Sequence, residues 1–350
     1  MTDTRPGLVA LLGSGETSPA GGRLFEEVVR HISRPPRIAV LETPAGFELN
    51  SAQVAGRVAD FLRLRLQNYN PGVVTLPARK RNTAFSPDDP ALASHLLGAD
   101  LIFMGPGSPT YAARQLHDSR AWYTLIARHR MGAALVFASA ATIAIGRHVL
   151  PVYEIYKAGE ELHWRPGLNL FGAYGLSLVI VSHWNNAEGG ADLDTSRCFM
   201  GEARFAELTA LLPPDTTVVG INEHTGMIVD FGEEQCHVMG RGSVTLIKAR
   251  QEEQFGAGQS IPLTRLGPFR LPRLSEGLPA DILEEALAIP SDTAGAPPLP
   301  PAEVVALVEE RQMARGQRDW AVADTLRQRI ADLGWSVLDT PEGPRVEPWL

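Results

Sequence analysis

Short, almost continuously apolar segments recur along the first 250 residues, and longer amphipathic segments separate them. The apolar segments are Leu8–Leu12, Ile38–Leu41, Val73–Leu76, Leu101–Met104, Ala134–Ala138, Leu178–Val181 and Val218–Ile221. Strands that are covered by helices on both faces have this character. The alternation predicts an α/β fold with a doubly wound, mainly parallel sheet and right-handed crossovers. A terminal antiparallel meander is predicted for Met227–Phe231, Gln235–Met239 and Val244–Ile247.

The composition of the chain narrows the classes of function. Its 350 residues carry a formal net charge of -8, which argues against general binding of nucleic acid or of an anionic membrane surface. No apolar stretch reaches the roughly 18 residues that span a bilayer, and residues 1–6 lack the pattern of a signal peptide. Cys198 and Cys236 provide neither a disulfide framework nor a metal knuckle. We therefore expect a cytoplasmic protein without a membrane partner, and the sequence indicates no particular oligomeric state.

The sequence divides into three parts. Residues 1–250 carry the alternating strand and helix pattern. Residues 251–301 are rich in Gly, Pro and Arg, so we expect an irregular extension that ends in a semi-rigid, proline-rich linker. Residues 302–350 predict a small helical hairpin module, in which Gly316 ends the first helix and apolar residues at steps of three and four mark the second. A short strand at Trp335–Leu338 follows the hairpin.

Ser139 directly follows one of the predicted strands. Strand Ala134–Ala138 stops at the serine, and the helix-like run Thr142–Gly146 comes soon after it. A serine at a sharp strand-to-helix turn is a nucleophile elbow, because the turn lifts the hydroxyl above the sheet and the helix N-terminus favours developing negative charge. The small residues Ala140 and Ala141 leave room for such a turn. The structural alternative is an ordinary helix-capping serine.

Two later strand ends supply partners for a serine nucleophile. His183 follows strand Leu178–Val181, and Glu223 follows strand Val218–Ile221. The carboxyl ends of parallel strands meet at one edge of the sheet, where ligands bind. A serine, a histidine base and an orienting carboxylate together form a hydrolase constellation. His224 is a rival base, although neighbours in an extended segment point to opposite faces.

Two glycine-rich loops also follow strands. Gly105–Tyr111 exposes backbone N–H groups that can hold an oxyanion or a carboxylate. Gly13–Thr17 matches neither the phosphate-binding P-loop nor the dinucleotide fingerprint, so nucleotide binding is not predicted. A metal site is a weaker alternative, because no HxH or HExxH spacing supports it. Its ligands would come from His183, Asp192, Asp194, His224 and His237.

The order of these motifs resembles the dipeptidase E and cyanophycinase group of serine peptidases. The group's last motif, Gly-Ile-Asp-Glu-x-Thr-Ala, is close to Gly-Ile-Asn-Glu-His-Thr-Gly at Gly220–Gly226. The resemblance covers roughly Leu8–Ile247. It implies a class I glutamine amidotransferase-like α/β fold.

The same resemblance implies roles for individual residues. Ser139 would be the nucleophile, His183 the base and Glu223 the acid that orients the base. The backbone N–H groups of Gly107 and Ala140 would form the oxyanion hole. No cofactor and no metal are implied.

Three positions depart from the pattern of that group. Phe137 and Ala141 stand where the group has two elbow glycines, and Asn222 stands where it has an aspartate. A bulky side chain two residues before the nucleophile can crowd a strained turn. These departures favour the alternative function, which is a non-catalytic scaffold that binds a ligand or serves translation.

The end of the chain resembles another family. Arg311–Arg315, Asp319–Arg327 and Asp339–Gly343 are similar to the C-terminal subdomain of cysteinyl-tRNA synthetase, over about Val304–Glu347. The synthetase signatures HIGH and KMSKS are absent, so we do not expect this chain to charge tRNA. From Pro301 onward there are six arginines, no lysine and nine acidic residues. This balance favours a module for protein contacts, with tRNA binding through the tail as the alternative.

The leading hypothesis is therefore a serine hydrolase that acts on a small peptide or amide substrate. Candidate side chains for the substrate pocket are Tyr111, Tyr153, Tyr156, Lys157, Trp184 and Asn185. Lys157 or Arg147 would pair with an acidic substrate.

Overall fold

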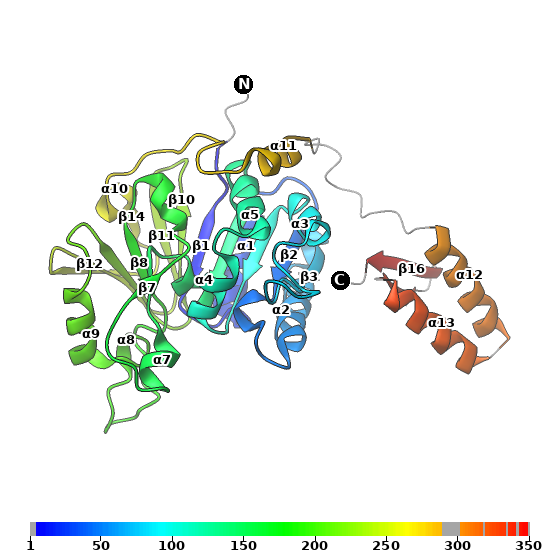
Figure 1. Ribbon diagram of the computed structural model, residues 1–350, viewed down its shortest axis with the longest axis horizontal. Helices are drawn as coiled ribbons and strands as arrows, with labels where there is room; N and C mark the ends of the chain where they lie inside the picture. Colours follow the sequence, from blue (N-terminus) through cyan, green and yellow to red (C-terminus); the bar gives the residue numbers. More distant parts are fainter. Residues whose placement is uncertain (1–4, 289–301, 318, 334, 341–342, 349–350) are drawn as a thin grey trace. The chain divides into compact units, whose positions relative to one another are not determined.

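The computed structural model describes residues 5–288, 302–317, 319–333, 335–340 and 343–348. The chain falls into two compact units, Met1–Ile289 and Pro290–Leu350 (Figure 1). The first unit contains the predicted strands and helices, and the second contains the predicted helical module. Among the described residues, no helix is long and apolar enough to cross a membrane.

An eight-stranded sheet forms the centre of the first unit, with the strand order β14-β11-β10-β1-β5-β4-β2-β3. Its strands are β1 (Val9–Leu12), β2 (Arg37–Leu41), β3 (Gly72–Leu76), β4 (Leu101–Met104), β5 (Ala134–Ala138), β10 (Thr225–Asp230), β11 (Gln235–Gly240) and β14 (Ser260–Pro262). The first five are parallel to their neighbours among themselves, whereas the last three add antiparallel pairs at one side. The predicted α/β class with a mainly parallel sheet is confirmed.

Alternate residues of the central strand β1 face two separate cores. Val9 and Leu11 pack into one apolar cluster, and Ala10 and Leu12 pack into the other. Helices cover both faces, which explains why the strands are apolar along their whole length. The helices are α1 (Pro19–Val29) and α2 (Ser51–Arg65) on the Leu12 side, and α3 (Pro90–Leu97), α4 (Pro109–Leu116) and α5 (Arg120–Arg130) on the Leu11 side.

A second sheet, with the order β13-β12-β9-β8, carries the other predicted strands. Its strands are β8 (Leu178–Val181), β9 (Thr217–Ile221), β12 (Ser243–Lys248) and β13 (Gln251–Gly256). The predicted three-stranded meander is therefore corrected, because β12 leaves β11 and pairs with β9. The cause lies in the connecting turn. Arg241 N–H donates to the His224 carbonyl at 3.1 Å, and Asn222 N–H donates to the Ser243 carbonyl at 3.1 Å.

Residues 251–288 were expected to be irregular, but they form regular elements. Besides β13 and β14 they include α10 (Leu263–Leu266) and α11 (Ala280–Ala288). Ile282 and Ala286 of α11 pack against Ala127 of α5, and Arg120 forms an ion pair with Asp281 at 3.2 Å. The segment is ordered by these contacts with the main sheet and its helices, and its own apolar periodicity is too weak to reveal them.

Short elements connect the strands of both sheets. They are η1 (Thr43–Ala45), η2 (Gln67–Tyr69), α6 (Ala140–Ala144), β6 (His148–Val149), α7 (Val152–Tyr156), β7 (Arg165–Pro166), η3 (Leu170–Tyr174), α8 (Ser196–Phe199) and α9 (Gly201–Ala210). Strands β6 and β7 pair with each other.

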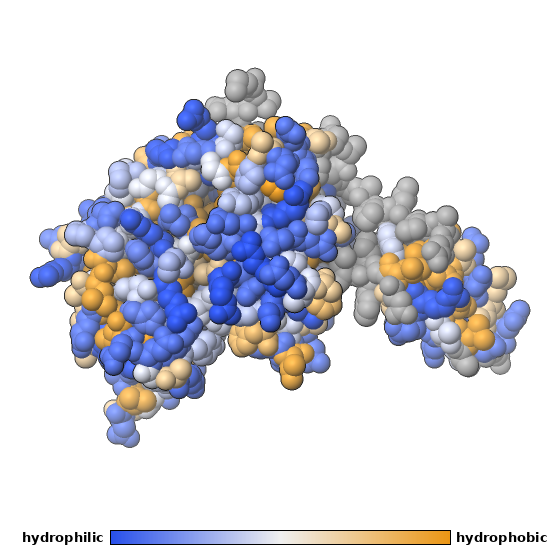
Figure 2. Space-filling model, viewed as in Figure 1, coloured by the Kyte–Doolittle hydropathy of each residue, from blue (hydrophilic) through white to orange (hydrophobic). Residues whose placement is uncertain are grey.

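On the face seen in Figure 2, small apolar patches lie among hydrophilic residues.

The second unit is a helical hairpin followed by a β-hairpin. Its elements are α12 (Ala302–Gly316), α13 (Trp320–Asp332), β15 (Trp335–Thr340) and β16 (Gly343–Pro348). A small apolar core joins them, formed by Val304, Leu307, Val308, Leu326, Ile330, Trp335 and Val337. Trp320 remains 57% exposed, and the Arg315 guanidinium lies over its ring at 5.7 Å. The predicted C-terminal helical module is confirmed.

A buried polar network lies between α5 and η3, away from the strand ends that carry Ser139. His129 is fully buried, its Nε2 lies 2.8 Å from the Tyr174 hydroxyl, and its Nδ1 faces the Ala133 carbonyl at 3.4 Å. Nδ1 therefore carries the proton, and Tyr174 donates to Nε2. Burial lowers the pKa of His129 to about 3, and burial raises the pKa of Tyr174.

Stability should therefore fall as the pH falls from about 6.5 to about 3. In this window the unfolded chain protonates His129, whereas the folded chain keeps it neutral, so the folded state loses roughly 5 kcal/mol in total. In the double variant His129→Phe, Tyr174→Phe we expect the urea unfolding free energy to depend less on pH in this window. Tyr174→Phe alone keeps the buried histidine and should retain the wild-type dependence. An equal pH dependence in the double variant would contradict this account.

Candidate active site

Ser139 occupies a strained turn between β5 and α6. Its backbone has φ 53° and ψ -114°, a region that L-residues rarely adopt and that is common at functional sites. Two hydrogen bonds to the Leu12 carbonyl hold the turn, one from Ser139 N–H at 3.1 Å and one from Thr142 Oγ1 at 2.9 Å. The serine side chain is partly exposed, whereas Ala138 and Ala140 on either side are buried. The turn has the form of the predicted elbow.

The two residues that replace the elbow glycines, Phe137 and Ala141, are both compatible with this turn. Phe137 is fully buried in the core on the Leu11 side, in register with Leu11 and Met104 of the neighbouring strands. Its ring therefore packs on the Leu11 face of the sheet and does not fill the turn at Ser139. Ala141 is buried and donates its N–H to the Gly105 carbonyl at 3.2 Å.

Ser139, His183 and Glu223 form a continuous chain of hydrogen bonds. Ser139 Oγ lies 2.9 Å from His183 Nε2, and His183 Nδ1 lies 2.8 Å from Glu223 Oε1. The carboxylate accepts a hydrogen bond from Nδ1–H, which leaves the lone pair of Nε2 free to accept a hydrogen bond from the serine hydroxyl. The side chains of His183 and Glu223 are 23% and 30% exposed, so the chain is reachable from solvent. The structure thus brings together the three residues selected from the sequence.

Glu223 is held at its backbone and at its carboxylate. Asn185 Oδ1 accepts from Glu223 N–H at 2.7 Å, and Asn186 Nδ2 donates to Glu223 Oε1 at 3.2 Å. Burial alone would raise the pKa of Glu223, but the hydrogen bonds from His183 and Asn186 outweigh it, and His183 and His224 lower it further through the charge that each carries when protonated. The pKa of Glu223 is therefore held below its ordinary value, and the group is a carboxylate at neutral pH.

Gly107 and Ala140 are the residues whose backbone N–H groups were predicted to form an oxyanion hole. Ala140 N–H stands at the start of α6, and Gly107 lies in the loop after β4 with φ 141°. A Cβ at Gly107 would lie 2.0 Å from the Pro44 carbonyl oxygen, so only glycine fits against η1. Ser108 N–H secures this contact by donating to the same carbonyl at 2.8 Å. Within the described residues, neither Gly107 N–H nor Ala140 N–H donates a hydrogen bond.

The residues proposed to line the substrate pocket occupy different environments. Lys157 is exposed, with Nζ over the Tyr156 ring at 5.1 Å, and Asn185 is exposed beside Glu223. Tyr111 is 8% exposed and donates its hydroxyl proton to the Arg79 carbonyl at 2.9 Å. Tyr111 is therefore packed and has its hydroxyl already engaged.

Trp184 also differs from the prediction, because it lies in the core and is 3% exposed. Its indole meets the ring of Phe205 edge-on at 5.1 Å. Gly220 of β9 has no side chain, which leaves the space that the indole fills. Trp184 therefore packs in the core next to His183 and is not available to line a substrate pocket.

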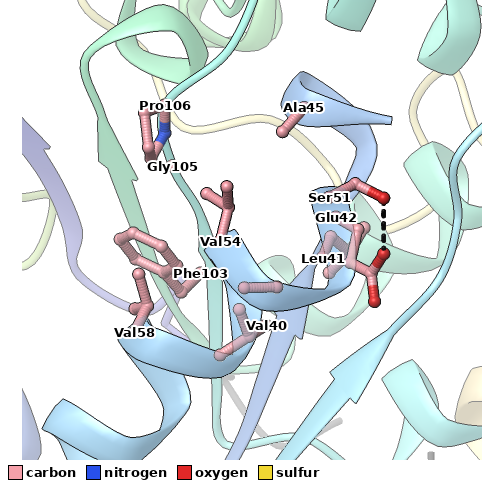
Figure 3. Close-up of a pocket in the computed structure, with 11 residues that line it drawn as sticks. Val40, Leu41, Glu42, Ala45, Ser51, Val54, Val58, Phe103, Gly105 and Pro106 are labelled. Carbon is pink, nitrogen blue, oxygen red and sulfur yellow. Dashed lines mark hydrogen bonds between the residues drawn. The ribbon is translucent and has the colours of Figure 1, made fainter. Parts of the chain in front are cut away.

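A small cavity lies beside the loop that carries Gly107, but it does not include Ser139. Figure 3 shows its lining, in which Ser51 Oγ is hydrogen-bonded to Glu42 Oε2 at 3.2 Å. Its volume of about 10 Å³ is near the lower limit for one water molecule. Glu42 is 4% exposed and is neutralised by Arg79 at 2.6 Å. This cavity is too small for a substrate. The ion pair between Arg79 and Glu42 lies at its edge.

The other nucleophile and ligand candidates are placed elsewhere. Cys198 and Cys236 are free and buried. Burial raises the pKa of Cys198 to about 12, and burial raises the pKa of Cys236 as well, so both remain thiols. In the part of the chain that the structure describes, no group of three or more His, Cys, Asp or Glu residues is arranged to hold a metal ion.

Two residues of the site were missed in the sequence. Asn186, which contacts Glu223, is in the same short motif as His183, so its position next to a strand-end histidine was an available signal. Arg197 stacks on Trp184 with its guanidinium carbon 4.0 Å from the ring centre. Its contact depends on an unusual backbone turn, which no sequence pattern indicates.

Comparison with known proteins supports both predicted resemblances. The structure is similar to the crystal structure of a peptidase from an acI-B1 Actinobacterium, with a TM-score of 0.60 and 22% sequence identity over 74% of this chain and 98% of that chain. A similarity at this level of identity shows the fold alone. The first unit therefore has a peptidase-type α/β fold.

The tail matches a different kind of protein. Residues 297–344 match the family model of the cysteinyl-tRNA ligase anticodon binding domain. The cysteine–tRNA ligase of Methanosarcina mazei is 51% identical over 47 residues, which are 13% of this chain and 10% of that protein. That of Chlamydia abortus is 49% identical over 49 residues, again 10% of its length. The chain thus spans about a tenth of the length of these curated relatives.

We expect Glu223→Gln to be far more damaging than His224→Ala. An amide at position 223 no longer fixes the Nδ1–H tautomer of His183, and a comparable change in another serine hydrolase costs about 10⁴-fold. The side chain of His224 is exposed, and the hydrogen bond to Ser14 Oγ at 3.2 Å comes from its backbone N–H, which alanine retains. The loss of the imidazole should therefore slow labelling less than roughly 10-fold. The measurement is the second-order rate of Ser139 labelling by a fluorophosphonate probe. Loss of labelling in His224→Ala with a near wild-type rate in Glu223→Gln would reverse the assignment.

Proposed function

We propose that this chain is a serine hydrolase of the peptidase or amidase type, acting on a peptide or amide bond of a small substrate. The observation that carries the proposal is the hydrogen-bonded chain from Ser139 Oγ through His183 to Glu223, at distances of 2.9 Å and 2.8 Å. The positive φ of Ser139 adds to this support, because it exposes the hydroxyl at the end of the sheet.

The geometry supports a two-step acyl transfer. Ser139 Oγ attacks the carbonyl carbon of the substrate while its proton passes to His183 Nε2. Collapse of the tetrahedral intermediate breaks the C–N bond, and His183 gives the proton to the departing amine, which leaves an ester on Ser139. Water, deprotonated by His183, then attacks this ester and releases the acid product and the serine.

Glu223 and the two backbone N–H groups supply the electrostatic part of this mechanism. The Glu223 carboxylate stabilises the imidazolium that forms at His183 in each step. The N–H groups of Gly107 and Ala140 are proposed to donate to the oxyanion of the tetrahedral intermediate. Removing one such donor from a serine hydrolase costs about 10²–10³-fold in rate.

The peptidase-type fold adds general support, since the related peptidase structure covers 74% of this chain. The position of Phe137 in the core also favours catalysis over a non-catalytic scaffold, because the ring does not fill the elbow. We assign the protein to the cytoplasm on the basis of its two unpaired, buried cysteines.

We infer a second, separate function for the tail, which is recognition of a translation-related partner. The observation that favours it is the 51% identity over 47 residues to a cysteine–tRNA ligase. Six arginines against nine acidic residues after Pro301 give this segment a net charge of -3 (6 minus 9). Any binding of tRNA by the tail should therefore involve few phosphate contacts and depend only weakly on salt.

Ser139→Ala should abolish labelling by a broad fluorophosphonate probe and all hydrolysis of a peptide library. The nucleophile is removed, and losing one member of such a unit costs many orders of magnitude in rate. Thermal unfolding should remain close to that of the wild type, because the side chain is partly exposed and small. The matched control is Ser94→Ala, which replaces an exposed serine on α3. If Ser139→Ala retains activity, the nucleophile is another residue.

Deleting residues 302–350 should leave a folded first unit with an unchanged labelling rate at Ser139. The reason is that each unit has its own apolar core. Circular dichroism and probe labelling test this part. Fluorescence anisotropy with unfractionated tRNA, for full-length and truncated protein at two salt concentrations, tests the tail. Aggregation or loss of labelling in the truncated protein would make the tail part of the hydrolase unit, and equal tRNA binding by both proteins would remove the tail from tRNA recognition.

A further inference from the structure

The turn before α9 has a left-handed backbone. Three successive non-glycine residues of this turn have positive φ: Arg197 at 55°, Cys198 at 58° and Phe199 at 69°. The left-handed conformation costs roughly 1–2 kcal/mol for each L-residue with a Cβ. Strain of this kind persists only where surrounding structure imposes it, and it concentrates at functional sites.

The N–H groups of this turn bind the segment that carries the catalytic base. Cys198 N–H donates to the His183 carbonyl at 3.1 Å, and Arg197 N–H donates to the Trp184 carbonyl at 2.8 Å. His183 itself has a positive φ of 50°. The left-handed turn therefore fixes the backbone of the base in a conformation that it would not adopt by preference.

The side chain of Arg197 extends this contact toward β9. Its guanidinium carbon lies 4.0 Å from the centre of the Trp184 ring. The indole also packs against Gly220, where a Cβ would lie 2.2 Å from a ring atom. The backbone N–H of Trp184 donates to the Ile221 carbonyl at 3.1 Å. The indole is thus pressed against the strand that ends just before Glu223.

Asp194 holds both ends of the turn. Its carboxylate accepts from Ser196 N–H at 2.9 Å and from Glu202 N–H at 2.7 Å. These hydrogen bonds lower the pKa of Asp194. The turn is therefore held before any substrate arrives.

We propose that Arg197 is a positioning residue for the His183–Glu223 pair, which rests on the proposed hydrolase function. The side chain of Arg197 contacts Trp184 and forms an ion pair with Glu202 at 3.5 Å. It acts through Trp184, the neighbour of His183, whose indole packs on Gly220 of β9. This packing holds the segment after β8 in place and hence supports the 2.8 Å contact between His183 Nδ1 and Glu223 Oε1. A planar guanidinium stacks on an aromatic face in a way that an ammonium group does not reproduce.

The test uses full-length protein and the variants Arg197→Met and Arg197→Lys. The control is Arg265→Met, which removes a surface arginine paired with Glu253. Three quantities are measured: the second-order rate of fluorophosphonate labelling at Ser139, the downfield proton resonance of His183 Nδ1–H, and the melting temperature. We expect Arg197→Met to slow labelling about 10- to 100-fold, because a small misplacement of a catalytic group has effects of this size. The resonance should shift or broaden, Arg197→Lys should be intermediate, and Arg265→Met should match the wild type.

A wild-type labelling rate and resonance in folded Arg197→Met would overturn the proposal. A lower melting temperature with an unchanged resonance would do the same, because it would show a merely structural role. If wild-type Ser139 does not label at all, the hydrolase function fails, and the His183 resonance alone then decides whether Arg197 positions the pair. If Arg197→Met does not fold, Arg197→Lys carries the same two readouts.

Discussion

The backbone of Leu12 and Gly13, at the end of the central strand, is bonded to all three segments of the site. The Leu12 carbonyl accepts hydrogen bonds from the Ser139 N–H and the Thr142 hydroxyl. The Gly13 carbonyl accepts from His183 N–H at 3.3 Å, and Gly13 N–H donates to the Thr225 carbonyl at 2.9 Å, next to the turn of Glu223. One dipeptide thus helps to set the mutual positions of the proposed nucleophile, base and acid, and β1 has an apolar core on each face.

The four residues from His183 to Asn186 provide more than the base. Asn185 holds the backbone of Glu223, and Asn186 donates to the same carboxylate oxygen that His183 contacts. The segment therefore presents an imidazole and also fixes the carboxylate that orients it. The segment His183–Asn186 therefore holds both the backbone and the carboxylate of Glu223.

Much of the fold and the centre of the site could be predicted from the sequence, because they depend on local patterns. The continuous apolar strands, the serine between β5 and α6 and the strand-end His183 and Glu223 are local in this sense. The division into two sheets depended on long-range pairing of β12 with β9, which apolar periodicity does not encode. The burial of Trp184 depended on Gly220, a residue 36 positions away in the sequence. A left-handed turn of Arg197, Cys198 and Phe199 could not be predicted, because none of these residue types prefers positive φ.

The nucleophile and its partners come from different sheets. Ser139 ends a strand of the eight-stranded sheet, whereas His183 and Glu223 follow strands of the four-stranded sheet, and one continuous core that includes Leu11, Phe137 and Val181 lies between them. The hydrogen bond between Ser139 and His183 therefore depends on how the two sheets pack against each other. The proposed chemistry thus depends on the packing between the two sheets, because that packing fixes the distance from Ser139 Oγ to His183 Nε2.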